Sequence, residues 1–179
     1  MKILKMPTSE HLHECFVYSG GDLYWKYRPE SHFKKQRTAN MWNAKFAGKR
    51  AGRKMAGMDY RQVGVDGVRY LEHRVIAAMF GVSTDACIDH KDRTGRNEIE
   101  NLRPATQQQN SWNNEGWKKK SSRVGTWEKK NGKWVAYIRV GGSMRHLGTF
   151  SSESEAVAAR VGAERLYYGE FAISSGSSA

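Results

Sequence analysis

Apolar and polar residues alternate along several short stretches of the chain, each interrupted by a glycine-containing pair. The first stretch runs from Phe16 to Trp25 around Gly20-Gly21, and the second runs from Tyr60 to Leu71 around Asp66-Gly67. Pairs of this composition form the two-residue turns that join antiparallel strands. Both stretches are therefore predicted to be β-hairpins.

Helical spacing replaces this alternation at two places. Directly after the second hairpin, apolar residues recur every three or four positions from Glu72 to Phe80, and Gly81 provides a C-cap. Near the C-terminus, Ser152 and Glu155 have the spacing of a capping box at the start of a helix that is expected to end at Gly169. Strands and helices thus follow one another in mixed order, which predicts the α+β class.

Three further strands are predicted before the C-terminal helix. They cover Trp127 to Lys130, Lys133 to Val140 and Ser143 to Leu147, and the pairs Asn131-Gly132 and Gly141-Gly142 separate them. We expect a three-stranded antiparallel sheet packed on one helix. Alternation along the middle strand sends one set of side chains toward the helix and the other outward. The inward set is Trp134, Ala136 and Ile138, and the outward set is Val135, Tyr137 and Arg139.

The net charge of +12 on 179 residues predicts a polyanionic partner, because the positive charge is clustered. Residues 34–54 contain eight Lys and Arg and no acid, and the whole segment from Arg28 to Gly57 is predicted to be irregular. This segment is either a solvated connection anchored by a few aromatic rings or a basic arm that follows DNA phosphates, and the charge favours the arm. The DNA-contacting candidates in it are Lys45, Lys49, Arg50, Arg53 and Lys54.

Other sequence features exclude several classes of protein. Cys15 and Cys87 are the two cysteines, which excludes a disulfide framework and a four-cysteine zinc site. No apolar run approaches the ~20 residues of a membrane span, and residues 1–5 lack the apolar stretch of a signal peptide. A cytoplasmic protein without a membrane partner is expected.

One short stretch concentrates residues suited to phosphodiester cleavage. Asp89-His90 ends a short apolar segment, and Asn97, Asn101 and Asn110 follow within about twenty residues. An imidazole with a reference pKa of about 6.5 can take a proton from water near neutral pH. Carboxylate and amide oxygens suit Mg²⁺ or Mn²⁺, which neutralise charge on a phosphate. The stretch therefore predicts His90 as general base, with Asp89 and Asn110 as ligands of one divalent ion.

These residues resemble the HNH endonuclease family, specifically its phage and homing type. The residues that carry the resemblance are His73-Arg74-Val75-Ile76-Ala77, Ile88-Asp89-His90-Lys91-Asp92, Asn97, Asn101-Leu102-Arg103, Thr106 and Asn110. The resemblance implies a ββα-metal nuclease fold, with hydrolysis of DNA to 5′-phosphate and 3′-hydroxyl ends. It gives Asn101 the role of holding the loop and orienting His90, within the catalytic set.

Two assignments in this motif have alternatives. Asn113 or Asn114 replaces Asn110 as metal ligand if the helical register is shifted. His73 is interpreted as a structural histidine, because it lies beside the apolar face of its helix.

The C-terminal sheet and helix resemble the AP2 DNA-binding domain over roughly residues 123–173. The resemblance rests on the segments 132–139, 147–150 and 155–158. In that family the outward sheet face lies in the major groove of DNA, which implies a set of groove-facing residues here. That set is Trp127, Lys129, Tyr137, Arg139 and His146, with Arg145 close by.

The predicted organisation is a nuclease domain over 1–115, a basic linker over 116–123, the AP2-like domain over 124–173 and a disordered tail over 174–179. The expected function is a DNA endonuclease acting on double-stranded DNA. A non-catalytic DNA-binding regulator with a degenerate nuclease fold and a structured-RNA binder are the alternatives. No heptad or other dimer signature is visible, so a monomer and a transient dimer both stay open.

Overall fold

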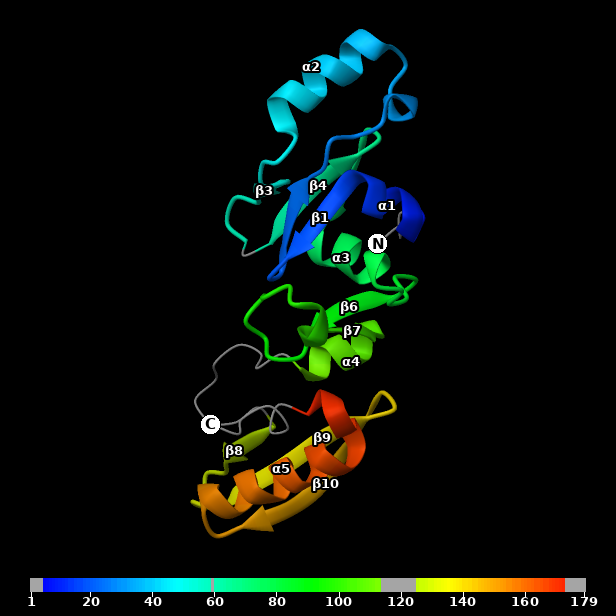
Figure 1. The fold of residues 1–179 in the computed structure, drawn as a ribbon. Coiled ribbons are helices and arrows are strands. Elements are labelled where there is room, and N and C mark those ends of the chain that lie inside the picture. Colours follow the sequence, from blue (N-terminus) through cyan, green and yellow to red (C-terminus); the bar gives the residue numbers. More distant parts are fainter. Residues whose placement is uncertain (1–4, 59, 114–124, 173–179) are drawn as a thin grey trace. The chain divides into compact units, whose positions relative to one another are not determined.

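The computed structural model describes residues 5–58, 60–113 and 125–172, and the chain divides into two compact units, Met1–Gln107 and Gln108–Ala179. Both units combine helices with small antiparallel sheets (Figure 1), which confirms the predicted α+β class at this level. The predicted linker and tail lie outside the described residues. No helix in the described ranges has both the length and the apolar character that crossing a membrane requires.

Unit 1 alternates short helices with short strands. Its elements are α1 (Ser9–Cys15), β1 (Phe16–Ser19), β2 (Asp22–Trp25), the 3-10 helix η1 (Glu30–His32), α2 (Gln36–Phe46), β3 (Arg53–Lys54), β4 (Arg61–Val65), β5 (Val68–Leu71), α3 (Glu72–Met79), β6 (Cys87–His90), the 3-10 helix η2 (Ile99–Asn101) and β7 (Leu102–Ala105). The helix α4 (Gln107–Trp112) begins at the last residue of unit 1 and continues in unit 2.

Both hairpins predicted in this part of the chain are present. Strand β1 pairs with β2 from Phe16↔Trp25 to Ser19↔Asp22. Strand β4 pairs with β5, and the turn residues Asp66 and Gly67 have φ of 49° and 80°. Two successive residues with positive φ match the twist of the flanking strands, and Asp and Gly tolerate this conformation best.

The predicted helix after the second hairpin is α3, and it supplies much of the core of unit 1. Val75, Ile76 and Ala77 are fully buried, and α3 packs against α1 and the β4–β5 hairpin. Phe16 at the start of β1 joins the same cluster. This core fixes the first turn of α3, which begins at Glu72, beside the motif residues described below.

The prediction that residues 28–57 are irregular is wrong, because they contain α2. Trp42 packs edge-on against Trp25, with ring centroids 4.8 Å apart. The buried amide of Asn43 accepts a hydrogen bond from the Arg28 N–H and donates one to the Arg28 carbonyl, each at 2.9 Å. Helix α2 is thus held in place by contacts that Trp42 and Asn43 make with residues distant in sequence, although most of its other residues are polar. Helix α1 was likewise not predicted.

Unit 2 has the predicted three strands and one helix. Its further elements are β8 (Thr126–Glu128), β9 (Trp134–Val140), β10 (Ser143–Phe150), α5 (Glu153–Tyr168) and the 3-10 helix η3 (Gly169–Phe171). The strand order is β10-β9-β8, and α5 lies across one face of the sheet (Figure 1). The Ser152 hydroxyl accepts a hydrogen bond from the Glu155 N–H, and Gly169 with φ of 55° ends the helix, as predicted.

The inward and outward sets predicted for β9 need one correction. Val135, expected to face outward, is fully buried, whereas Trp134 is only half-buried. The reason is that β9 is the central strand. Trp127 and Thr149 lie directly opposite Val135 on the two neighbouring strands, so their side chains can cover it from both sides.

Candidate functional site

The predicted catalytic pair lies at the end of β6, in a hairpin with β7. Asp89 pairs with Arg103 and His90 with Leu102 across the two strands. Both Asp89 and His90 are buried, with exposed fractions of 4% and 7%. The hairpin therefore holds the two adjacent side chains on a regular backbone, and the loop between the strands contains the motif residues Lys91, Asp92, Asn97 and Asn101.

A hydrogen bond to the Asn97 side-chain oxygen indicates which nitrogen of His90 carries the proton. The His90 Nε2 lies 2.9 Å from the Asn97 Oδ1, and the Asn97 Nδ2 donates to the Glu72 carboxylate at 3.4 Å. Because a carboxylate only accepts, the Asn97 amide must present its oxygen to His90. The Nε2 is then protonated and donates, which leaves Nδ1 as the basic nitrogen of the neutral ring.

Glu72 is itself fixed by a buried ion pair. It is 1% exposed, and both of its carboxylate oxygens accept hydrogen bonds from the Arg50 guanidinium. Arg50 also bonds the Asp22 carboxylate and donates to the carbonyls of Leu23 and Ala51. A chain of contacts thus runs from the basic segment through Glu72 and Asn97 to the ring of His90.

Asn101 holds the loop between β6 and β7. Its side-chain oxygen accepts from the Asp92 N–H at 3.0 Å, and its side-chain nitrogen donates to the Arg96 carbonyl at 2.7 Å. Burial by itself raises the pKa of the Asp92 carboxyl, but hydrogen bonds from Thr94, Arg96 and Asn101 lower it well below its usual range. The loop is therefore closed around an ionised carboxylate, with the geometry that the sequence-based role of Asn101 requires.

Asp89 offers donor chemistry that fits a hard divalent ion. Its Oδ2 accepts from Arg103 Nε at 2.9 Å and lies 2.8 Å from Arg103 Nη2. This buried ion pair orients the carboxylate. Mg²⁺ is commonly held by one or two carboxylates together with waters and phosphate oxygens, so one carboxylate at this position is compatible with the predicted metal.

The second predicted ligand belongs to a different part of the chain. Asn110 is exposed on α4, in the portion of that helix that groups with unit 2. Of the alternatives, Asn113 is buried and Asn114 lies outside the described residues. Asn110 as a metal ligand stays a prediction from the sequence.

His73, interpreted from the sequence as a structural histidine, lies in direct contact with His90, the predicted base. The ring of His73 packs edge-on against the ring of His90, with centroids 5.0 Å apart, and the ring of Tyr60 lies 5.4 Å from the ring of His73. Burial, together with the nearby His90 and Arg74, lowers the pKa of His73 to about 3. His73 is therefore neutral near pH 7, and its uncharged ring packs against His90.

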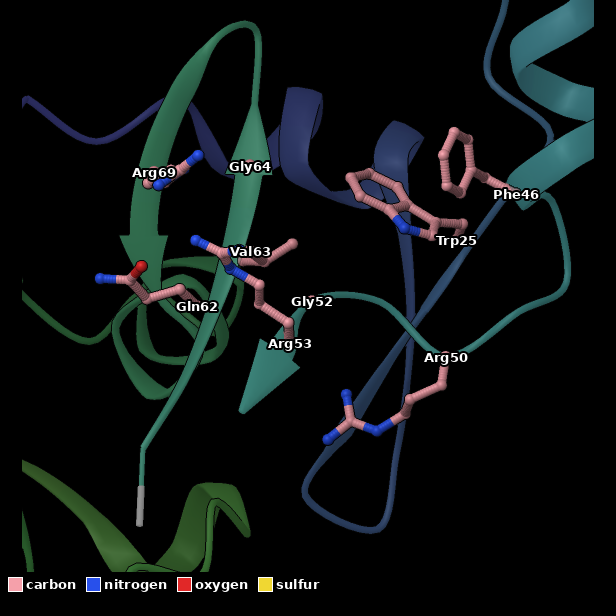
Figure 2. A pocket seen from close by; sticks show the side chains of 9 residues that line it. All are labelled: Trp25, Phe46, Arg50, Gly52, Arg53, Gln62, Val63, Gly64 and Arg69. Atoms are coloured by element: carbon pink, nitrogen blue, oxygen red, sulfur yellow. The ribbon is translucent and has the colours of Figure 1, made fainter. Parts of the chain in front are cut away.

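The basic segment forms a surface around a pocket of about 290 Å³ (Figure 2). The pocket is lined by Arg50, Arg53, Arg69 and Gln62, with Trp25 and Phe46 at one side. Like Arg53 and Lys54 on β3, Lys45 and Lys49 are exposed, as contact with a phosphate backbone requires. Arg50 differs from them, because its guanidinium is held by Glu72 and Asp22.

On unit 2, aromatic rings form a row on the outer face of the sheet. Trp127 stacks on Tyr137 at 4.9 Å, and the ring of His146 lies 4.8 Å from that of Tyr137. Trp127 is 44% exposed, and Arg139 and Lys129 are exposed as well. Arg145 is the exception: it pairs with the inward-facing Ile138, and its guanidinium lies over the ring of Tyr167 on α5 at 5.4 Å, so its predicted place near the groove-facing residues is wrong. Most of the predicted groove-facing side chains are therefore accessible together.

Comparison of the chain with protein-family models, curated proteins and solved structures gives no match. The assignment of a function therefore depends on the site itself. The sequence did not predict that Glu72 holds Asn97 or that Arg103 pairs with Asp89. It marked Asn97 as a motif residue but did not predict its hydrogen bond with His90. Glu72 directly precedes His73 in the motif, but an acid in the first turn of a helix is a common feature with a purely local explanation.

Replacing Asn97 tests the proposed protonation state of His90. In the unaltered protein, nitrogen NMR of the neutral ring is expected to show the Nε2-protonated tautomer. Asn97→Ala removes the acceptor at 2.9 Å, so the population of the Nδ1-protonated tautomer should rise. Asn40→Ala, which alters an exposed asparagine on α2, serves as the matched control and should leave the ring unchanged. An unchanged tautomer in Asn97→Ala would show that Asn97 does not select it.

Proposed function

We propose that the protein is a metal-dependent DNA endonuclease of the HNH type. The observation that carries the proposal is the adjacent pair Asp89 and His90, with the His90 Nε2 hydrogen-bonded to Asn97 so that Nδ1 is basic. A general base needs its lone pair available in the neutral state and its ring fixed in orientation. Asn97 and Glu72 support the second requirement, because their hydrogen bonds fix the orientation of the ring.

The proposed reaction is hydrolysis of a DNA phosphodiester bond. His90 Nδ1 takes a proton from water as the water oxygen bonds to phosphorus, and the bond to the 3′ oxygen breaks, which leaves 5′-phosphate and 3′-hydroxyl ends. Mg²⁺ or Mn²⁺ would supply charge neutralisation at the phosphate and at the departing oxygen. Asp89 would hold this ion, and Arg103 would keep the carboxylate in place. Neutral His73 adds no competing charge beside the base.

Binding of double-stranded DNA is assigned to two surfaces. In unit 1, the exposed Lys45, Lys49, Arg53 and Lys54 suit contacts to the phosphate backbone, which is read without sequence preference. In unit 2, the AP2-like sheet presents Arg139 and the row of rings, and exposed sheet residues of this kind can contact base edges in the major groove. The proposal thus separates general affinity from site selection.

Replacing His90 tests the proposed base. His90→Ala is expected to slow cleavage of DNA in Mg²⁺ or Mn²⁺ by about 10²–10⁴-fold, the usual contribution of a general base, whereas DNA affinity measured by gel shift stays unchanged. The matched control is His13→Ala, which alters an exposed histidine on α1. Cleavage by His90→Ala at the rate of the unaltered protein would disprove the assignment.

Replacing Arg139 tests the sheet as a DNA-reading surface. Arg139→Ala should weaken binding to the preferred DNA site by about 1–3 kcal/mol if it contacts a base, with a smaller loss on unrelated DNA. Arg165→Ala removes the same charge from an exposed position on α5 and serves as the control. Equal losses in the two variants, on both kinds of DNA, would mean that Arg139 contributes only general charge.

A non-catalytic DNA-binding regulator is the second candidate. Two observations favour it: Asp89 is engaged by Arg103, and the ring of His90 is largely buried. Both surfaces proposed for DNA would serve such a regulator equally well. The two candidates therefore differ only in whether the DNA backbone is cut.

A further inference from the structure

We propose that His11, Cys15 and His32 form a structural zinc site in unit 1, with Asp66 as the fourth ligand. Within the described ranges, this is the place where three side chains of metal-binding type converge, with one ligand atom of each within 4.8 Å of the others. The proposal concerns a site apart from Asp89 and His90, and it does not depend on the nuclease function.

The ligand atoms have the spacing of a tetrahedral site. His11 and Cys15 are four residues apart on α1 and share one helix face, while His32 comes from η1. The Cys15 Sγ lies 3.7 Å from His11 Nε2 and 3.9 Å from His32 Nδ1. With Zn–S of about 2.3 Å and Zn–N of about 2.0–2.1 Å at tetrahedral angles, the S–N separation would be about 3.6 Å. Small side-chain shifts therefore suffice to bring these atoms around one ion.

Glu14 orients the histidines for this role. Its Oε2 lies 2.7 Å from His32 Nε2, so the other ring nitrogen, Nδ1, is the one directed toward Cys15. The same Oε2 lies 3.8 Å from His11 Nδ1. Zinc-binding histidines typically hold a carboxylate or carbonyl through the nitrogen that does not bind the metal. Glu14 accepts from the non-ligating nitrogen of His32 in this way, and it lies within 3.8 Å of the corresponding nitrogen of His11.

Asp66 provides the fourth donor from the β4–β5 turn. Its Oδ2 lies 2.6 Å from His11 Nε2, and its Oδ1 accepts from Arg28 Nη2 at 2.7 Å. Arg28 Nε also donates to His32 Nδ1 at 3.1 Å, and a metal would replace this contact as well as the one between His11 and Asp66. With the metal bound, Asp66 would turn Oδ2 from His11 to the ion and keep Oδ1 on Arg28.

Charge and burial also favour a divalent ion here. A Cys15 thiolate and the carboxylates of Glu14 and Asp66 carry three negative charges, against the single positive charge of Arg28. A divalent cation brings the group to neutrality. The Cys15 side chain is fully buried, and the side chains of His32 and His11 are 6% and 26% exposed, whereas that of Asp66 is 47% exposed, so three of the four ligands are shielded from water as in a structural site. The mixed sulfur and nitrogen donors select zinc over magnesium.

The site would fasten three segments of unit 1. The ligands come from α1, η1 and the β4–β5 turn, and His11 and Asp66 are 55 positions apart. A metal that binds the folded unit and not the unfolded chain stabilises the fold. We expect one equivalent of Zn²⁺ to raise the melting temperature of unit 1 by about 5 °C or more.

The test uses the full chain and Co²⁺ as a spectroscopic substitute for Zn²⁺. One equivalent of Co²⁺ should give a thiolate-to-cobalt charge-transfer band in the near ultraviolet and the intense visible bands of a tetrahedral ion, and Zn²⁺ should abolish both. Cys15→Ser should lose the charge-transfer band, and His32→Ala should lose the tetrahedral visible bands. Cys87→Ser and His13→Ala, which alter the other cysteine and a non-ligand histidine of α1, should keep all of them.

The absence of a charge-transfer band in the unaltered protein, or its persistence in Cys15→Ser, would overturn the proposal. Circular dichroism and the melting temperature without metal separate lost binding from lost folding, and His32→Ala is the second variant if Cys15→Ser does not fold. A magnesium site built on Asp89 contains no sulfur and cannot produce the band. Loss of DNA cleavage in a His90 variant would therefore leave this result unchanged.

Discussion

The buried ion pair between Glu72 and Arg50 is the interaction on which the candidate active site depends. Glu72 is nearly inaccessible to water, so its charge requires a partner, and removing one member of such a pair typically costs about 3–5 kcal/mol. The pair joins the basic segment to the first turn of α3. From there, the Glu72 carboxylate orients the Asn97 amide, and Asn97 selects the tautomer of His90. A structural ion pair and the ring of the proposed general base thus belong to one network.

The basic segment consequently has two physical roles. Arg50 is directed inward and neutralises a buried acid, whereas Lys49 and Arg53, on either side of it in sequence, are exposed. Positive charge at the surface attracts a phosphate backbone over several ångströms and is screened by salt. Charge inside the unit is screened much less and acts on the geometry of the motif. DNA affinity should therefore depend strongly on salt, and the orientation of His90 should not.

Local signals made part of this fold predictable. Glycine-containing turns marked both hairpins of unit 1 and the strands of unit 2, and the apolar spacing after Leu71 marked α3. Helix α2 was missed because its stability comes from distant contacts, such as that of Trp42 with Trp25. The link from Glu72 to Asn97 was missed for the same reason, since it joins positions 25 apart. The motif residues could be identified from the sequence, but the residues to which they hydrogen-bond could not be predicted from it.

The proposed function requires that the Asp89-His90 hairpin cut DNA. The most direct measurement is incubation of the full chain with supercoiled plasmid DNA, with and without added Mg²⁺, followed by analysis of the ends. We expect a discrete nick or break with 5′-phosphate and 3′-hydroxyl ends that forms only when Mg²⁺ is added. Intact DNA that is nevertheless bound by the protein under both conditions would contradict it and would support a DNA-binding regulator instead.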